Sequence, residues 1–354
     1  MNLFLYIISR LYLFLIFVWS KLYDYNIFKS KKFEPKIISI GNIVVGGAGK
    51  TPMIIFFSSL LKKEGIKHAI ISRGYKKKKG GSFFVSDSKK ILINNPSLCG
   101  EEPLLLAKKL PKIPVLVGEE KIASIKLAIK KEQPQIILID DGFQSRKIHV
   151  DYNVVLIDSL IKKEDFRFLP FGTLREPLSS LKRSNLIIVT KTNFKASGRY
   201  AQHAPMFLSL AEKARIPIIK ASYIETFSVF NKKTQALHPL SKDAPVDAPS
   251  FLLSGIARQE SFQIIAKKKY SNIVKNYRFA DHHHYAYEDL FPIFNKETKK
   301  QSKVCITTYK DFIKIQLLEN LIKDFSIEFH VIDVEHKLSV SSKKIIENNI
   351  KKLI

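Results

Sequence analysis

Short aliphatic runs alternate with longer helical stretches through the first two thirds of the chain. Strands are predicted at 36–40, 68–72, 114–117, 136–139, 154–157 and 186–189, and helical stretches at 52–64 and 123–132. Such alternation is typical of an α/β fold, in which helices cover both faces of a mostly parallel sheet. A sheet of this kind binds its ligands at the carboxyl ends of the strands.

The alternation stops between Asn231 and Ser250, where three prolines and little periodicity predict a linker or a ribbon-like connection. Apolar segments resume at 251–253, 304–306 and 329–332, which predicts a second, smaller α/β domain. A length of 354 residues also favours two domains over one. The predicted division is an N-terminal helix in 1–32, a first domain in 33–225, a hinge in 226–250 and a C-terminal domain in 251–354.

The N-terminal segment Leu3–Tyr25 is strongly apolar and aromatic, but Ser9 and Arg10 interrupt it. The unbroken run 11–19 holds nine residues, whereas a membrane-spanning helix needs about 20 apolar ones. No basic segment precedes the run and no small-residue cleavage site follows it, so a signal peptide fits poorly. We therefore predict a helix that lies in a membrane interface, and a buried core helix is the alternative.

The formal net charge of +27 comes mostly from lysine. Such a balance attracts polyanions, which include nucleic acid, anionic lipid and phosphorylated substrates. The lysines are scattered, however, so a general drift of composition towards Lys, Ile and Asn explains them equally well. Two cysteines, Cys99 and Cys305, are too few for a disulfide framework or a metal cage and fit a reducing compartment such as the cytoplasm.

A glycine-rich turn, GNIVVGGAGKTP, joins the first strand to the helix that follows it. Glycines let backbone N–H groups converge on phosphate oxygens, and the helix N-terminus adds partial positive charge. Lys50 is expected to reach the β- and γ-phosphates of a nucleotide, and Thr51 to offer its hydroxyl to Mg²⁺. Val44 stands where the usual pattern has a glycine, and a turn without function is the alternative. The loop itself consists of Gly46, Gly47, Ala48 and Gly49.

A phosphate loop of this kind needs an acidic partner at the end of another strand. The stretch IILIDDGFQ supplies it, because four aliphatic residues lead to Asp140 and Asp141. One carboxylate is expected to hold Mg²⁺ and the other to orient the loop. A pair that only caps a turn is the alternative. Together the two motifs predict a P-loop phosphotransferase or nucleoside triphosphatase, but they do not identify the acceptor.

Five further motifs occur in a fixed order: ISRGY, GEEPLLLA, DDGFQ, LPFGTLREP and FADHHHY. With the phosphate loop, this set resembles the tetraacyldisaccharide 4′-kinases of lipid A biosynthesis, from the N-terminal helix to about Ile313. The resemblance implies a kinase that uses ATP and Mg²⁺ at the cytoplasmic face of the inner membrane. It also implies transfer of phosphate to the 4′-hydroxyl of a lipid A disaccharide 1-phosphate precursor, which gives lipid IVA. The expected fold is two α/β domains joined by a ribbon-like hinge.

The resemblance assigns the catalytic base to an aspartate of a Gly-Asp-Glu-Pro motif, where this chain has Glu101. The longer side chain moves the carboxylate by about one C–C bond, and a misplacement of ~1 Å can cost about 100-fold in rate. Glu101 remains the predicted base, with Glu102 supporting the metal or the loop. His282 is the predicted partner of Glu101. A metal site in the run 282–284 is disfavoured, because neighbouring side chains face different points.

Two residues of the LREP motif are expected to reach into the site. Arg175 would stabilise the transferring phosphate and Glu176 would help to hold Mg²⁺, whereas a surface ion pair is the alternative. Arg73 and Tyr75 would line the cleft towards the substrate's phosphate and sugars. The predicted contacts near the nucleotide phosphates are Asn42 and Gln144.

Three positions depart from the pattern of the family. Lys121 stands where a substrate-binding arginine is expected, so charge is kept but bidentate phosphate geometry is lost. Ser145 replaces a histidine, and Tyr309 replaces the glutamate of a Thr-Glu-Lys-Asp pattern. These changes bear on substrate contacts and purine recognition more than on the type of reaction.

Two other functions compete with this interpretation. A different P-loop enzyme, such as a GTPase-like metallochaperone or a biosynthetic ligase, would carry an Asn-Lys-x-Asp motif. The nearest candidate is 191–193, which lacks the aspartate. A catalytically inactive membrane or nucleic-acid binding protein would not need the intact Lys50, Asp140 and Asp141. Because aromatic residues do not interleave with basic ones in a binding groove, no nucleic-acid partner is expected.

Overall fold

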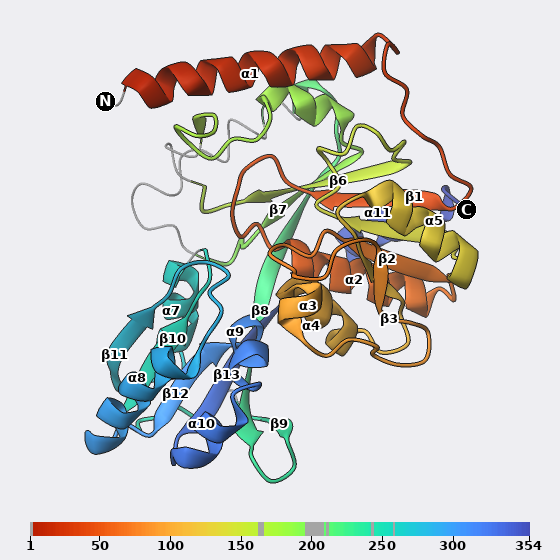
Figure 1. The fold of residues 1–354 in the computed structure, drawn as a ribbon. Coiled ribbons are helices and arrows are strands. Elements are labelled where there is room, and N and C mark those ends of the chain that lie inside the picture. The colour runs from red at the N-terminus through yellow and green to blue at the C-terminus, as the bar shows by residue number, and fades with distance from the viewer. Residues whose placement is uncertain (1–2, 162–165, 195–208, 210–211, 242–243, 258) are drawn as a thin grey trace.

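The computed structural model describes residues 3–161, 166–194, 209, 212–241, 244–257 and 259–354. Within them, a single sheet runs through both lobes of the molecule (Figure 1). Its strands are β1 (Lys36–Gly41), β2 (His68–Ser72), β3 (Phe83–Ser86), β4 (Val115–Val117), β5 (Ile136–Asp140), β6 (Tyr152–Asp158), β7 (Leu186–Thr190), β8 (Ile218–Asn231), β9 (Ala236–Pro239), β10 (Ser250–Ser254), β11 (Ile273–Arg278), β12 (Val304–Thr308) and β13 (Glu328–Leu338). Their order in the sheet is β11-β10-β12-β13-β8-β7-β6-β1-β5-β2-β4-β3, with β9 paired to β8.

The helices follow the same alternation. They are α1 (Leu3–Asp24), α2 (Lys50–Lys63), α3 (Pro96–Cys99), α4 (Glu101–Lys109), α5 (Lys121–Glu132), α7 (Gln259–Lys267), α8 (Tyr287–Lys299), α9 (Tyr309–Ile315), α10 (Glu319–Asp324) and α11 (Val340–Lys351), with a 3₁₀ turn at Leu178–Arg183. The predicted strands and helices of the first domain are confirmed to within a few residues at each end. The helix expected at 52–64 begins two residues earlier, at Lys50.

The first lobe is a mostly parallel sheet between two layers of helices. Its central strands are buried along nearly their whole length, as expected when both faces are covered. Because side chains alternate between faces, Ile38 and Ile40 pack with α2 and α4, whereas Ile37 packs on the opposite face with α5. The carboxyl ends of β1, β2 and β5 therefore meet at one edge, which is where the predicted site residues follow.

The two lobes are joined by a two-stranded ribbon. The start of β8 pairs with β7 of the first lobe, and the remainder pairs antiparallel with β13, from Ala221 opposite Leu338 to Val229 opposite His330. After β13 the chain returns to the first lobe, where Leu338 and α11 join the core of α2 and α4. The ribbon therefore differs from the predicted hinge at 226–250, and the C-terminal helix does not belong to the second lobe. The apolar segment predicted at 329–332 lies in β13, but its pairing with β8 was not predicted, because antiparallel partners so far apart in the chain leave no local signal.

Helix α1 lies along the outside of the first lobe (Figure 1). The Ser9 hydroxyl donates to the Phe168 carbonyl at 3.0 Å, and near the other end Arg146 donates to Asp24 at 2.8 Å. By length and composition α1 could cross a membrane, but only 6% of its apolar window is buried in the molecule. The alternative of a buried core helix is therefore wrong. Its exposed apolar side chains include Phe4, Ile7, Leu11, Phe14, Leu15 and Phe17.

Candidate active site

The phosphate loop leads from β1 into α2, and its last glycine has two constraints. Gly49 adopts a φ of 83°, in the left-handed region that favours glycine. A Cβ at this position would lie 2.5 Å from the Tyr223 hydroxyl and 2.8 Å from His336 Nε2. Any other residue would therefore clash with the ribbon strands β8 and β13. The loop can approach the ribbon only because position 49 is glycine.

Lys50, the first residue of α2, extends towards the end of β5. Its ammonium lies 3.4 Å from Asn42 Oδ1 and 3.7 Å from Asp141 Oδ1. The Asn42 side chain donates to the carbonyls of Val44 and Gly46, which shapes the loop from within. The Gln144 amide in turn donates to the Asn42 carbonyl at 2.8 Å. The predicted nucleotide contacts are therefore assembled around one turn.

The two aspartates lie at the carboxyl end of β5 in different environments. Asp140 is buried and accepts a 2.9 Å hydrogen bond from Ser72 at the end of the neighbouring strand β2. Burial, followed by repulsion from Glu102, raises the pKa of Asp140 to about 7. Burial acts in the same direction on Asp141, but Lys50 and Arg175 outweigh it and hold its pKa below the ordinary value. The two carboxyl groups therefore differ in their tendency to be ionised.

The donor set at this edge suits Mg²⁺. No group of three or more His, Cys, Asp or Glu side chains that could form a metal cage occurs in the described part of the chain. Mg²⁺ does not require one, because it is commonly held by one or two carboxylates with substrate phosphates and water. Asp140 Oδ1 is buried without a hydrogen-bond partner among the described residues, which leaves one carboxylate oxygen for a cation. Asp140 and Asp141 fit the ion, whereas the place of the Thr51 hydroxyl beside it remains a prediction.

Arg175 reaches the site from a loop that pairs with the phosphate loop. The Arg175 backbone N–H donates to the Ile43 carbonyl at 2.8 Å, and its guanidinium donates to Asp141 Oδ2 at 2.6 Å. Glu176, the next residue, is buried and forms its ion pair with Arg183, whose guanidinium stacks over the Phe143 ring. No contact links Glu176 to the two aspartates, so its predicted place beside the metal remains a prediction.

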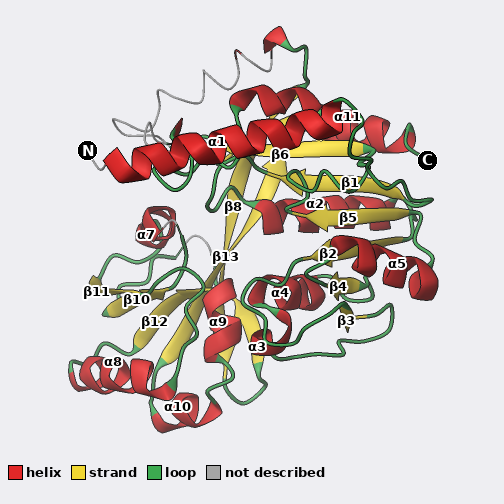
Figure 2. Cartoon of the chain, turned by 45° about the horizontal axis from the view of Figure 1, so that its top comes forward, coloured by secondary structure: helices red, strands yellow, loops and turns green. Residues whose placement is uncertain are grey.

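The second half of the site lies where the lobes meet. Glu101 is the first residue of α4, so its carboxylate is placed at a helix N-terminus, where negative charge is favoured. His282 of the second lobe contacts Glu101 through Nδ1 and adopts a φ of 60°. The predicted pair of Glu101 and His282 is therefore in contact. Figure 2 shows α4 of the first lobe beside α9 of the second.

Two lysines of α9 complete this cluster, and neither was among the predicted site residues. Lys314 lies 2.8 Å from Glu101 Oε2, and Lys310 lies 3.1 Å from Oε1 and 3.2 Å from Glu102. Burial raises the pKa of Glu101, but the His282 hydrogen bond and the two lysines outweigh it and hold that pKa far below its ordinary value. Their only signal in the sequence was the Thr-Tyr-Lys-Asp-Phe-Ile-Lys run, in which the acidic and basic residues fall on one helical turn.

The predicted substrate contacts take different positions. The Tyr75 ring lies 5.1 Å from the His282 ring and is largely exposed, as expected for a residue that lines a cleft. Arg73 is exposed at the end of β2. Lys121 differs from the expectation, because its ammonium donates to the Asp141 carbonyl at 2.6 Å and to the Ser145 hydroxyl at 3.1 Å. Lys121 therefore links the backbone at Asp141 to Ser145, which stands where the family pattern has a histidine.

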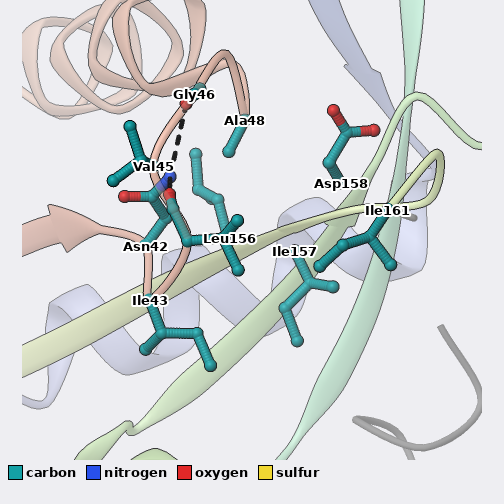
Figure 3. A pocket seen from close by; sticks show the side chains of 10 residues that line it. Asn42, Ile43, Val45, Gly46, Ala48, Leu156, Ile157, Asp158 and Ile161 are labelled. Carbon is teal, nitrogen blue, oxygen red and sulfur yellow. Dashed lines mark hydrogen bonds between the residues drawn. The ribbon is translucent and has the colours of Figure 1, made fainter. Parts of the chain in front are cut away.

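A small pocket lies behind the phosphate loop (Figure 3). Its free volume is about 10 Å³, which is space for at most one water molecule and not for a nucleotide base. Asp158 is the charged residue among those that line the pocket, and its carboxylate forms an ion pair with Lys191. The pocket is therefore part of the support of the loop. Its remaining lining is Asn42, Ile43, Val44, Val45, Gly46, Ala48, Leu156, Ile157 and Ile161.

A phosphate loop after β1, two aspartates at the carboxyl end of the neighbouring strand β5, and a carboxylate–histidine pair define a P-loop phosphotransferase. Comparison with known proteins makes this class specific. The model of the tetraacyldisaccharide-1-phosphate 4′-kinase family matches residues 1–353. The chain therefore belongs to this family.

Individual relatives agree with this assignment. The tetraacyldisaccharide 4′-kinase of Halothermothrix orenii is 30% identical over 346 residues, which cover 94% of this chain and 88% of that protein. The enzyme of the same name from Aquifex aeolicus is 32% identical over 337 residues, covering 93% and 94%. The crystal structure of LpxK from Aquifex aeolicus in complex with ATP superposes with a TM-score of 0.72 at 28% identity, covering 98% of this chain and 97% of that one.

Proposed function

We propose that this protein transfers the γ-phosphate of ATP, with Mg²⁺, to the 4′-hydroxyl of a tetraacyldisaccharide 1-phosphate, so that lipid IVA and ADP are formed. One observation carries the proposal: the phosphate-binding Lys50 and the base Glu101 belong to one electrostatic cluster. Burial and then Glu102, which is adjacent to Glu101, raise the pKa of Asp140. Burial also acts to raise the pKa of Glu102, but Lys310 and then Lys50 outweigh it and hold that pKa below its ordinary value. Lys50 and Glu101 therefore lie near each other on the first lobe, where His282 and Lys310 of the second lobe contact Glu101.

The loop and its cations are proposed to bind the triphosphate. The N–H groups at the start of α2 and the Lys50 ammonium would hold the β- and γ-phosphates. Bound Mg²⁺, held by Thr51, Asp140 and Asp141, supplies neutralisation of the charge on the phosphate oxygens. Arg175, fixed by its 2.6 Å contact with Asp141, is oriented to stabilise the transferred group.

Glu101 is proposed to accept the proton of the attacking hydroxyl. Its low pKa keeps it ionised at neutral pH, so the carboxylate is ready to accept without losing a proton first. As the hydroxyl oxygen bonds to phosphorus, its proton passes to Glu101 and the bond to the ADP oxygen breaks. His282, Lys310 and Lys314 hold the carboxylate in place. This support from the second lobe is what fixes a longer side chain where the family pattern has aspartate.

Helix α1 is proposed to hold the enzyme on the cytoplasmic face of the inner membrane. The helix is bonded to the first lobe at Ser9 and at Asp24, so a helix that stays docked lies parallel to the surface of the protein. Its exposed aromatic and aliphatic side chains can enter the acyl boundary while Arg10 and Lys21 remain at the headgroups. A tetraacylated substrate stays in the bilayer, so the enzyme must come to the headgroup plane.

The decisive experiment incubates the purified protein with ATP, Mg²⁺ and tetraacyldisaccharide 1-phosphate in mixed micelles, and detects the product by mass. We expect a gain of one phosphate on the lipid that requires both ATP and Mg²⁺. A protein that hydrolyses ATP without phosphorylating the lipid would contradict the proposal. Removal of residues 1–25 tests the membrane part separately, since it is expected to shift the enzyme to the soluble fraction and raise KM for the lipid.

A further inference from the structure

Three successive carbonyl groups of the phosphate loop are bound from behind by side chains outside the loop. Two of the donors stand side by side at the end of β7, and the third lies on the ribbon strand β13. The contacts are Lys191 Nζ to the Gly47 carbonyl at 2.8 Å, Thr190 Oγ1 to the Ala48 carbonyl at 3.0 Å, and His336 Nε2 to the Gly49 carbonyl at 3.0 Å.

These contacts fix the direction of the loop's N–H groups. In a planar trans peptide, a carbonyl and the N–H that follows it point in opposite directions. Holding the Ala48 carbonyl towards β7 therefore turns the Gly49 N–H the other way. The Gly49 carbonyl accepts from the Met53 N–H of α2 at 3.2 Å and from His336 of β13. Together these bonds turn the Lys50 N–H the other way, and as a first-turn amide it has no acceptor within its helix. These are the N–H groups that a phosphate needs.

The two donors on β7 are themselves fixed. Thr190 is fully buried, and Lys191 forms a buried ion pair with Asp158 at 2.6 Å. Lys191 begins the Lys-Thr-Asn run, which was the nearest candidate for an Asn-Lys-x-Asp motif but lacks the aspartate. Asn193 of that run instead bonds the backbone of Tyr223 in both directions at 2.9 Å. The run therefore serves the loop and the ribbon.

The third donor comes from the strand pair that joins the lobes. A carbonyl oxygen can only accept, so His336 must carry its proton on Nε2. Burial lowers the pKa of His336 to about 4, and the ring is therefore neutral at physiological pH. The ring packs 4.9 Å from that of Tyr223 on β8, and both approach Gly49 where a Cβ would be. The ribbon thus touches the phosphate loop directly.

We propose that Thr190, Lys191 and His336 are positioning residues that hold the phosphate loop with its Gly49 and Lys50 N–H groups turned towards the β- and γ-phosphates of the nucleotide. This inference rests on the proposed kinase function. It deepens that function by assigning a role to three residues whose side chains bind the carbonyl groups of the loop. It also assigns to the ribbon a second role besides joining the lobes.

The test compares variants that remove a donor with variants that keep one. Thr190→Val and His336→Leu remove the N–H or O–H, whereas Thr190→Ser and His336→Gln keep a donor near the same place. Losing one such hydrogen bond should weaken ATP binding by about fivefold, as expected from the net strength of a single bond. The donor-keeping variants should stay within about twofold of the wild type. Lys191→Met is made together with Asp158→Asn, so that the buried Asp158 carboxylate is not left without its lysine.

A second readout separates positioning from general damage. Affinities for ATP and for AMP are measured by competition, together with KM for the lipid and the thermal midpoint. AMP lacks the β- and γ-phosphates, so its affinity and the lipid KM should not change while ATP affinity falls. Equal weakening of ATP and AMP, or unchanged ATP affinity in Thr190→Val and His336→Leu, would overturn the inference.

Folding failure and failure of the kinase function are both distinguishable from this result. If His336→Leu does not fold, Thr190→Val carries the comparison, because valine has nearly the shape of threonine. A wild-type protein that does not phosphorylate the lipid contradicts the proposed function. A wild-type protein that does so, with donor-deficient variants of normal ATP affinity, contradicts the positioning role only.

Discussion

Replacement of Glu101 by glutamine is the sharpest test of the catalytic cluster. The substitution keeps the shape of the side chain and removes its charge, so no proton can be accepted from the attacking hydroxyl. The fold should survive, because each lysine retains another carboxylate: Lys314 lies 3.1 Å from Asp311, and Lys310 lies 3.2 Å from Glu102. The change therefore isolates the chemistry from the packing.

The expected loss follows from the value of a general base. Such a group contributes ~10²–10⁴-fold to the rate, so Glu101→Gln should lower kcat by that factor and raise the barrier by about 3–5 kcal/mol. KM for ATP should stay nearly unchanged, because the phosphate loop is not touched. The assay follows transfer of labelled γ-phosphate to the lipid under saturating ATP and Mg²⁺, with thermal unfolding measured on the same samples.

A matched control removes a carboxylate that has no place in the site. Glu225 lies on the ribbon strand β8 and pairs with Lys268, so Glu225→Gln should leave kcat unchanged. A Glu101→Gln enzyme with kcat within tenfold of the wild type would refute the assignment of the base. Loss of activity accompanied by unfolding would instead show that the cluster holds the lobes together.

Three further predictions follow from the same contacts. His336 has a folded pKa of about 4 against an ordinary value of 6.5, so its contribution to stability is complete above pH 6.5 and is lost as the pH falls to 4. That loss is about 3 kcal/mol. The free energy of unfolding of His336→Gln should therefore lack this part of the decrease between pH 7 and pH 4. Gly49→Ala should lower the free energy of unfolding by roughly 2–5 kcal/mol, since strain at positive φ adds to overpacking against the ribbon; a variant of wild-type thermal midpoint would contradict this. Tyr12→Phe removes the 3.0 Å bond from α1 to the Arg175 carbonyl and should lower kcat by about fivefold without changing membrane partitioning; an unchanged kcat would show that α1 only anchors the protein.

Much of the first lobe was predictable because its signals are local. Buried parallel strands are continuous aliphatic runs, and the end of such a run marks the edge where ligands bind. Lys50, Asp140 and Asp141 follow strands at this edge, so their mutual proximity could be predicted without coordinates. The pairing of Glu101 with His282 came from the resemblance of motifs, since nothing local connects residues 181 positions apart (282 − 101).

The tertiary structure decided the parts that depend on distant segments. A ribbon-like hinge was expected, but its two strands were not, because β8 and β13 are separated by the whole second lobe. For the same reason α11 was assigned to the wrong side of the hinge. No local sequence pattern singles out the two α9 lysines around Glu101. The same holds for the three donors behind the phosphate loop, which are Thr190, Lys191 and His336. A lysine that supports a carboxylate and one that is merely solvated look alike until the chain brings them to a partner.

The sequence by itself therefore determined the class of chemistry and the edge of the sheet where it occurs, because phosphate loops and strand-end carboxylates are short-range patterns. Only the fold decided how that chemistry is supported. Positioning contacts join residues by where strands cross, and the crossing of β13 behind Gly49 is a property of the folded chain.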